Sequence, residues 1–136
     1  MTKAKSKRSE NKEKKVLIVE DEQPIARAMD LKLKSKGIDT SVVYNGLTAL
    51  TTLERSGFDL MLLDLVMPKL DGFGVLKALK ERRDRPIIIV VTNLDEREIR
   101  QKAKALGASE VLGKANVSLD ELTNLVLRKM SKNSGS

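Results

Sequence analysis

The sequence predicts an α/β fold, a doubly wound five-stranded parallel sheet with helices packed on both of its faces. Two observations predict this fold. Residues 16–20, 58–64 and 86–92 are apolar at nearly every position, as in strands that are covered on both faces. Each expected strand is followed by a segment with apolar residues at helical spacing, and this alternation occurs five times.

The first two strand–helix units lie between residues 16 and 57. Residues 16–20, VLIVE, are expected to form the first strand, and residues 23–37 the first helix, with Pro24 near its first turn. Residues 38–44 are the second expected strand, and residues 46–57 form a short helix that ends at a glycine. The apolar positions of the first helix recur at helical spacing: Ile25, Ala28, Met29 and Leu33.

The remaining three units follow the same pattern. Ser118 and Glu121 form a capping box at the start of the last helix, and Pro68 and Gly72 are expected to shape the loop after the third strand. The strands are expected at 58–64, 86–92 and 110–113, and the helices at 73–83, 95–106 and 118–130.

Composition excludes several classes of protein. The 136 residues suffice for one domain with a core but not for two ordinary ones. The chain has no Cys and no His, which excludes disulfides, thiolate sites and imidazole catalysis. The sequence has neither a secretory signal nor an apolar stretch of the roughly 20 residues that a membrane span needs. We therefore expect a cytoplasmic protein without membrane contact.

Much of the positive charge lies in the first residues. Of the net charge of +7, residues 1–15 contribute +5, so the rest of the chain is nearly neutral. The segment has no aromatic side chain on which bases could stack, so residues 1–14 are predicted to be a disordered, solubilising tail without a specific nucleic-acid partner. Binding of nucleic acid through this tail remains an alternative. Residues 132–136 are expected to be a flexible polar end.

Polar residues stand where the expected strands end. Glu20 and Asp21 follow the first strand, Asp64 ends the third, Thr92 ends the fourth and Lys114 follows the fifth. Ligands of such sheets bind beyond the carboxyl ends of the strands. Clustered carboxylates without His or Cys favour Mg²⁺, and an added ammonium and hydroxyl suit a phosphoryl group. Taken singly, each residue could have an ordinary structural role: a strand-end cap, a helix N-cap or a solvated lysine.

Four segments carry a resemblance to a known family. KVLIVEDE (15–22), MLLDLVMPKLDG (61–72), IIIVVTN (87–93) and LGASEVLGK (106–114) resemble, in this order, the receiver domain of two-component response regulators. The resemblance spans residues 15–131. It implies a flavodoxin-like (βα)5 fold with strand order 2-1-3-4-5.

The resemblance also implies a role for each site residue. Asp64 matches the phospho-acceptor, and Asp21 matches a carboxylate that binds Mg²⁺. Glu20 matches the second acid, which reaches the ion through water, and the carbonyl of Val66 would complete the metal ligands. Thr92 would hydrogen-bond the phosphoryl group, and Lys114 would pair first with Asp64 and then with a phosphoryl oxygen.

The family implies the partners. A sensor histidine kinase or a phosphotransfer protein would donate the phosphoryl group, and a downstream protein would recognise the modified chain. We expect a stand-alone receiver that is a monomer or a weak phospho-dependent dimer, and that catalyses only its own phosphorylation and dephosphorylation. A pseudo-receiver that binds partners without phosphorylation is the alternative. A metal-dependent phosphohydrolase is disfavoured because the chain has no second DxD-type motif.

Several positions depart from the family pattern. Ala115 stands in place of the usual Pro, so we expect either a trans peptide bond with a re-routed loop or a strained bond. Val111 replaces the aromatic residue usual in receivers, which puts in doubt the usual coupling between the Thr92 hydroxyl and an aromatic ring. Asn93 replaces the usual small residue after the Thr, at the entrance to the site. Val66 and Leu94 are apolar and cannot orient an attacking water, which predicts slow self-dephosphorylation.

Overall fold

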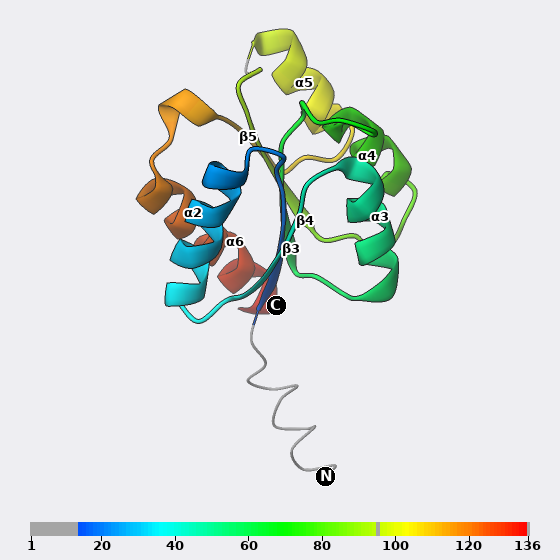
Figure 1. The fold of residues 1–136 in the computed structure, drawn as a ribbon. Helices are drawn as coiled ribbons and strands as arrows, with labels where there is room; N and C mark the ends of the chain where they lie inside the picture. The colour runs from blue at the N-terminus through cyan, green and yellow to red at the C-terminus, as the bar shows by residue number, and fades with distance from the viewer. Residues whose placement is uncertain (1–13, 95, 136) are drawn as a thin grey trace.

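The computed structural model describes residues 14–94 and 96–135, so the predicted tail lies, apart from Lys14, outside the described residues. The described chain alternates between strands and helices from Lys15 onward (Figure 1). Its elements are β1 (Lys15–Val19), α2 (Gln23–Ser35), β2 (Asp39–Val43), α3 (Gly46–Arg55), β3 (Leu60–Leu63), α4 (Gly72–Leu79), β4 (Ile87–Thr92), α5 (Arg97–Ala105), β5 (Glu110–Gly113), the 3-10 turn η1 (Lys114–Asn116) and α6 (Leu119–Gly135).

The five strands form one parallel sheet in the order β2-β1-β3-β4-β5, which confirms the predicted fold class and strand order. Val19 pairs with Leu63, and Leu63 pairs with Val90, so β1 and β3 end level with one another while β4 continues to Thr92. At the edge of the sheet, Thr92 pairs with Gly113. This register brings the residues that follow the strands to one edge.

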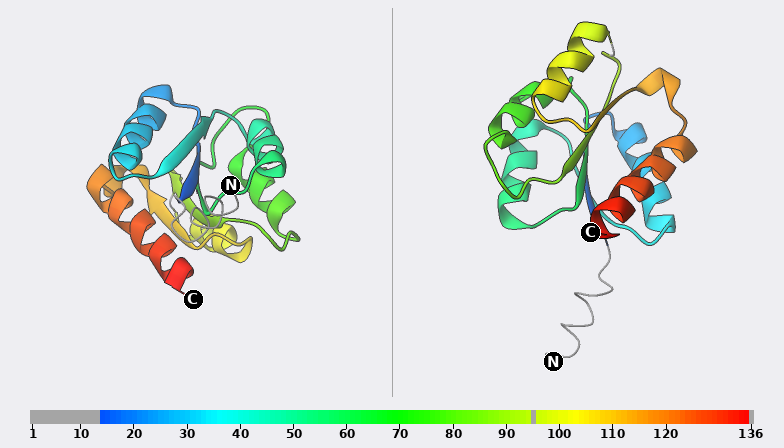
Figure 2. Two further views of the ribbon diagram at one scale, coloured as in Figure 1. Left: turned by 90° about the horizontal axis from the view of Figure 1, so that it is seen from below. Right: turned by 180° about the vertical axis from the view of Figure 1, so that it is seen from behind.

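Helices cover both faces of the sheet. α2 and α6 lie on one face, and α3, α4 and α5 lie on the other (Figures 1 and 2). Along β1, Val16 and Ile18 pack toward the first pair of helices, while Leu17 and Val19 pack toward the other three. Both sets are buried, and this explains why the strands are apolar at every position instead of alternating.

Helix ends differ from the predicted ones, by four residues or more in α4 and α6. α4 stops at Leu79 instead of residue 83, because residues 80–84 are all charged and offer no apolar side chain to the core. α6 begins with the predicted capping box, in which Ser118 and Glu121 exchange hydrogen bonds of 2.8 and 3.0 Å. It continues past residue 130 to Gly135, because no proline interrupts it and each added residue extends an existing helix. The flexibility expected of residues 132–136 stays a prediction.

Across residues 14–94 and 96–135, we find no helix with the length and apolar character that a membrane crossing requires.

Candidate functional site

The sequence-predicted acids meet at the carboxyl edge of the sheet. Glu20 directly follows β1 and Asp64 directly follows β3; the Asp64 N–H donates to the Val19 carbonyl at 3.0 Å and so extends the ladder by one residue. Carboxylate oxygens of Glu20, Asp21 and Asp64 lie within 4.8 Å of one another. Glu20 is 1% exposed and Asp64 4%, so two of these acids are buried. The arrangement could hold a hard, oxygen-binding cation.

The ammonium of Lys114 lies at the centre of the site. Its Nζ is 3.0 Å from Glu20 Oε1, 3.0 Å from Asp64 Oδ2 and 2.9 Å from Glu22 Oε1. Lys114 reaches this position because it is the first residue after β5, at the start of η1. The predicted pairing of Lys114 with Asp64 is therefore present in the structure. Glu20 is held by the same ammonium, which the sequence did not predict.

The close carboxylates and the ammonium change one another's acidity. Burial raises the pKa of Glu20 from 4.5 to about 7, and the charge of Asp64 adds to this rise, although the hydrogen bond from Lys114 opposes it. Burial also lowers the pKa of Lys114, but its hydrogen bonds to Glu22, Glu20 and Asp64 outweigh this effect and hold the pKa above its ordinary value. Glu20 consequently titrates near neutral pH.

The loop between β3 and α4 fixes the second oxygen of Asp64. The backbone N–H of Val66 donates to Asp64 Oδ1 at 3.3 Å, while the Val66 side chain is 53% exposed. Gly72 closes the loop by donating from its N–H to the Leu65 carbonyl at 3.0 Å. A Cβ at Gly72 would overlap the Asp64 carbonyl oxygen and lie 2.6 Å from the Leu65 Cα, so this position requires glycine. The structural role expected of Gly72 is confirmed.

Thr92 lies at the same edge but has a different hydrogen-bond partner. Its side chain is fully buried at the end of β4, and its hydroxyl accepts a hydrogen bond from the Leu94 N–H at 3.2 Å. Within the described part of the chain, no hydrogen bond joins Thr92 to Asp64 or Lys114. The structure thus places the hydroxyl at the site without direct contact to its charged groups.

The positions that depart from the family pattern have definite environments. Residues 114–116 form η1, and the peptide bonds of the described segments are all trans, which matches the first of the two alternatives expected at Ala115. Val111 is buried in β5, and its carbonyl accepts a hydrogen bond from Arg100 Nη1 at 2.9 Å. Asn93 is exposed at the end of β4. An apolar side chain therefore fills the position of the usual ring.

Sequence reasoning missed Glu22 as a site residue. Glu22 belongs to the run of three acids at 20–22, and the only signal for its role is that it continues this run. In the structure its carboxylate binds Lys114, and its N–H donates to Glu20 Oε2 at 3.1 Å. The site therefore contains four acids close to one ammonium.

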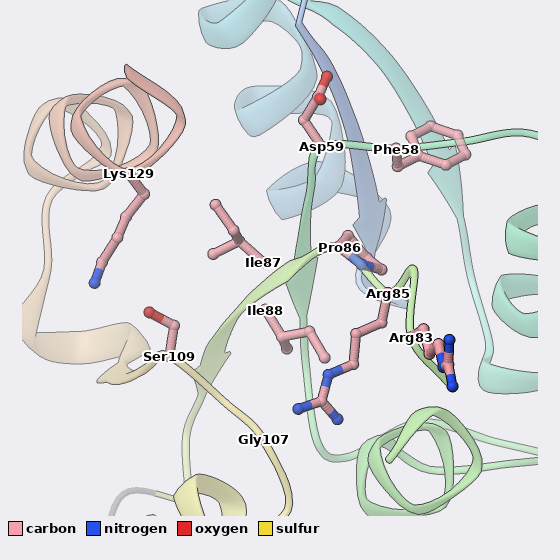
Figure 3. A pocket seen from close by; sticks show the side chains of 10 residues that line it. All are labelled: Phe58, Asp59, Arg83, Arg85, Pro86, Ile87, Ile88, Gly107, Ser109 and Lys129. Carbon is pink, nitrogen blue, oxygen red and sulfur yellow. The ribbon is translucent and has the colours of Figure 1, made fainter. Parts of the chain in front are cut away.

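A pocket of about 630 Å³ opens at the opposite edge of the sheet, away from the acidic cluster (Figure 3). Its lining includes Arg83, Arg85 and Lys129. Arg85 donates to the carbonyls of Leu79 and Lys80 at the end of α4, and Lys129 pairs with Glu110 at 3.0 Å. Cations at the carboxyl ends of helices stabilise the unpaired carbonyls there. A structural role at the end of α4 accounts for the contacts of Arg85, and the predicted site residues lie at the other, carboxyl edge of the sheet.

The fold and the site together define a class: a doubly wound α/β protein with an acidic cluster and a lysine beyond the carboxyl ends of its strands. The model of the response regulator receiver domain matches residues 16–127. The chain belongs to this family, whose members are the receiver domains of response regulators in two-component systems.

Related proteins and solved structures agree with this assignment. The chain is 42% identical over 81 residues to the sensory transduction protein RegX3 of Mycolicibacterium smegmatis, covering 60% of this chain and 36% of that protein. It is 35% identical over 120 residues to the probable transcriptional regulator ycf27 of Porphyridium aerugineum, covering 87% of this chain and 50% of that protein. The chain thus spans half or less of the length of these relatives.

The structural similarity extends over nearly the whole chain. The receiver domain of the Francisella response regulator 1452 superposes with a TM-score of 0.83 at 31% identity, covering 88% of this chain and 98% of that one. A CheY-like receiver domain protein from Methanospirillum hungatei JF-1 superposes with a TM-score of 0.84 at 23% identity, covering 90% and 98%. The second similarity supports the fold alone.

Proposed function

We propose that this chain is a phospho-accepting receiver whose Asp64 is phosphorylated in the presence of Mg²⁺. The observation that carries the proposal is the buried Asp64 carboxylate, which is joined by two further acids and by the ammonium of Lys114 at 3.0 Å. A buried carboxylate in contact with other carboxylates is costly unless cations balance it. A divalent cation and a lysine would balance it here and would also receive the oxygens of a phosphoryl group.

The donor set fits magnesium. Glu20, Asp21 and Asp64 offer only oxygen, which hard cations prefer, and the carbonyl of Val66 would add a neutral oxygen. When bound, Mg²⁺ would supply positive charge that stabilises the oxygens of the transferring group. The remaining chemistry belongs to the side chains of the chain itself.

In the proposed transfer, a carboxylate oxygen of Asp64 attacks the phosphorus in line. A P–O bond forms while the P–N bond of a phosphohistidine, or the P–O bond of an acyl phosphate, breaks, and the leaving group keeps the electron pair. Lys114 would neutralise a phosphoryl oxygen, and the Thr92 hydroxyl would turn from Leu94 to donate to another. The chain would catalyse only its own phosphorylation and dephosphorylation and no reaction of a separate substrate.

A pocket beside Lys114 supports the docking of a protein donor. An apolar pocket of about 330 Å³ lies between the starts of α2 and α6, and its lining includes Pro24, Ile25, Leu119 and Lys114. We infer that a sensor histidine kinase or a phosphotransfer protein, acting in the cytoplasm, presents its phosphohistidine from this side. The modified chain would then switch its interaction with a downstream protein. Val66 and Leu94, which cannot orient water, support a long-lived phosphoryl group.

Intact-mass spectrometry tests the proposal. The protein is incubated with acetyl phosphate and Mg²⁺, beside an Asp64→Asn variant, an EDTA control and an Asp84→Asn variant that removes an exposed acid outside the cluster. We expect a gain of one phosphoryl group in the wild type and in Asp84→Asn only. If the wild type gains no mass from acetyl phosphate or from a histidine kinase, the proposal fails and the pseudo-receiver is favoured.

A further inference from the structure

The three N–H donors of the Lys114 ammonium are matched by three carboxylates. A lysine ammonium has three donors and no acceptor. Glu20, Glu22 and Asp64 each accept from Nζ, at 3.1, 2.9 and 3.0 Å. A phosphoryl oxygen can therefore bind this ammonium only if one of the three carboxylates releases it.

The three carboxylates differ greatly in their access to water. The side chains of Glu20 and Asp64 are 2% and 4% exposed, while the side chain of Glu22 is 52% exposed. An exposed carboxylate that leaves its partner is rehydrated, so its separation costs little, whereas a buried one would lose its partner without gaining water. Of the two glutamates, Glu22 can therefore release Lys114 at the lower cost, while the contact of Asp64 would pass to its own phosphoryl group.

The start of α2 positions Glu22 for this contact. Glu22 is the N-cap residue of α2, but its side chain makes no capping hydrogen bond to the helix. Its carboxylate instead reaches Lys114, which is 92 positions away in the sequence, while its backbone N–H binds Glu20. The side chain thus bonds the ammonium instead of the free N–H groups of its own helix.

We propose that Glu22 is a positioning residue that holds Lys114 at the mouth of the site and that competes with a phosphoryl group on Asp64 for its ammonium. This inference rests on the proposed function. Glu22 also adds a fourth negative charge that faces an incoming phosphoryl donor. The hold of Glu22 on Lys114 and its added negative charge both slow phosphorylation. Only the hold on the ammonium requires Lys114.

Rates of phosphorylation by acetyl phosphate test the inference. The rates are measured by intact-mass spectrometry at a Mg²⁺ concentration that is shown to be saturating for each variant. We expect Glu22→Gln to be phosphorylated about 1.5 to 5 times faster than the wild type, the range that corresponds to one exposed ion pair. Glu81→Gln, which neutralises an exposed acid just beyond the carboxyl end of α4, should have the wild-type rate. Equal or slower phosphorylation of Glu22→Gln would overturn the inference while the proposed function stands.

A second comparison separates release of Lys114 from simple repulsion. Glu22→Gln is placed in a Lys114→Met background, and its rate is compared with that of Lys114→Met alone. If Glu22 acts through Lys114, the gain largely disappears in this background. An undiminished gain in the Lys114→Met background would overturn the positioning role. If the wild type itself accepts no phosphoryl group, both this inference and the proposed function fail.

Discussion

Replacing Lys114 by Met should destabilise the fold, because it removes the positive charge of the side chain. Met keeps much of the length of the lysine, so the change tests the charge more than the packing. Glu20 and Asp64 would remain buried without the ammonium that now lies 3.0 Å from each of them. Breaking a buried ion pair by removing one partner costs about 3–5 kcal/mol. Glu22 adds little to this cost because water can hydrate its exposed carboxylate.

The expected loss depends on pH. Glu20 has a pKa near 7, so below neutral pH it can take up a proton and remove one of the unbalanced charges. We therefore expect Lys114→Met to lose about 3 kcal/mol of unfolding free energy at pH 8 and clearly less at pH 5.5. Saturating Mg²⁺ should recover part of the loss, because the ion would replace the missing positive charge.

Urea unfolding followed by circular dichroism measures these differences, in EDTA and in MgCl₂. Lys34→Met is the matched control, because Lys34 pairs with Asp30 at 3.2 Å on the exposed surface of α2. Such a pair contributes only about 0.3–0.5 kcal/mol. If Lys114→Met at pH 8 in EDTA lost no more than Lys34→Met, Lys114 could not be what balances the buried acids, and the reasoning would be refuted.

Three further predictions concern the same edge of the sheet. Gly72→Ala should lower the free energy of unfolding by about 2 kcal/mol in urea, since its Cβ would overlap backbone at Asp64 and Leu65. In EDTA the free energy of unfolding of the wild type should fall by about 1–3 kcal/mol relative to that of Glu20→Gln as the pH rises from 4.5 to 7. The reason is that the folded protein holds the Glu20 proton more tightly than the unfolded chain does. By calorimetry, Asp21→Asn should weaken Mg²⁺ binding about tenfold, since it removes one of three clustered carboxylates.

Each of these predictions has a result that contradicts it. The control is Gly57→Ala, where a Cβ meets nothing within 4 Å, and it should change the free energy of unfolding by less than about 1 kcal/mol. If Gly72→Ala had no larger effect than this control, the loop would be able to adapt to the added Cβ. A pH-independent difference between wild type and Glu20→Gln would mean that the pKa of Glu20 is unshifted. Unchanged Mg²⁺ affinity in Asp21→Asn would remove Asp21 from the ligand set.

Local patterns in the sequence predicted the order of strands and helices well. Strands and helices follow from apolar spacing and from caps, such as the capping box of Ser118 and Glu121, because these signals involve residues within a few positions of each other. The candidate site residues could be proposed because they stand at or just beyond strand ends, and the strands of a parallel sheet end at one edge. The strand order came from the resemblance to receivers and not from periodicity, which identifies buried faces but not neighbouring strands.

The tertiary structure alone decided which side chains meet. Lys114 bonds Glu20, Glu22 and Asp64 across sequence separations of 94, 92 and 50 residues, and these contacts depend on how β1, β3 and β5 are placed in the sheet. The same placement buries Glu20 and raises its pKa. By itself, the sequence indicated most of the residues that gather at this edge, though not Glu22, since strand ends are local features. Their pairing, burial and acidity depend on the distances and solvent exclusion that only the packed sheet creates.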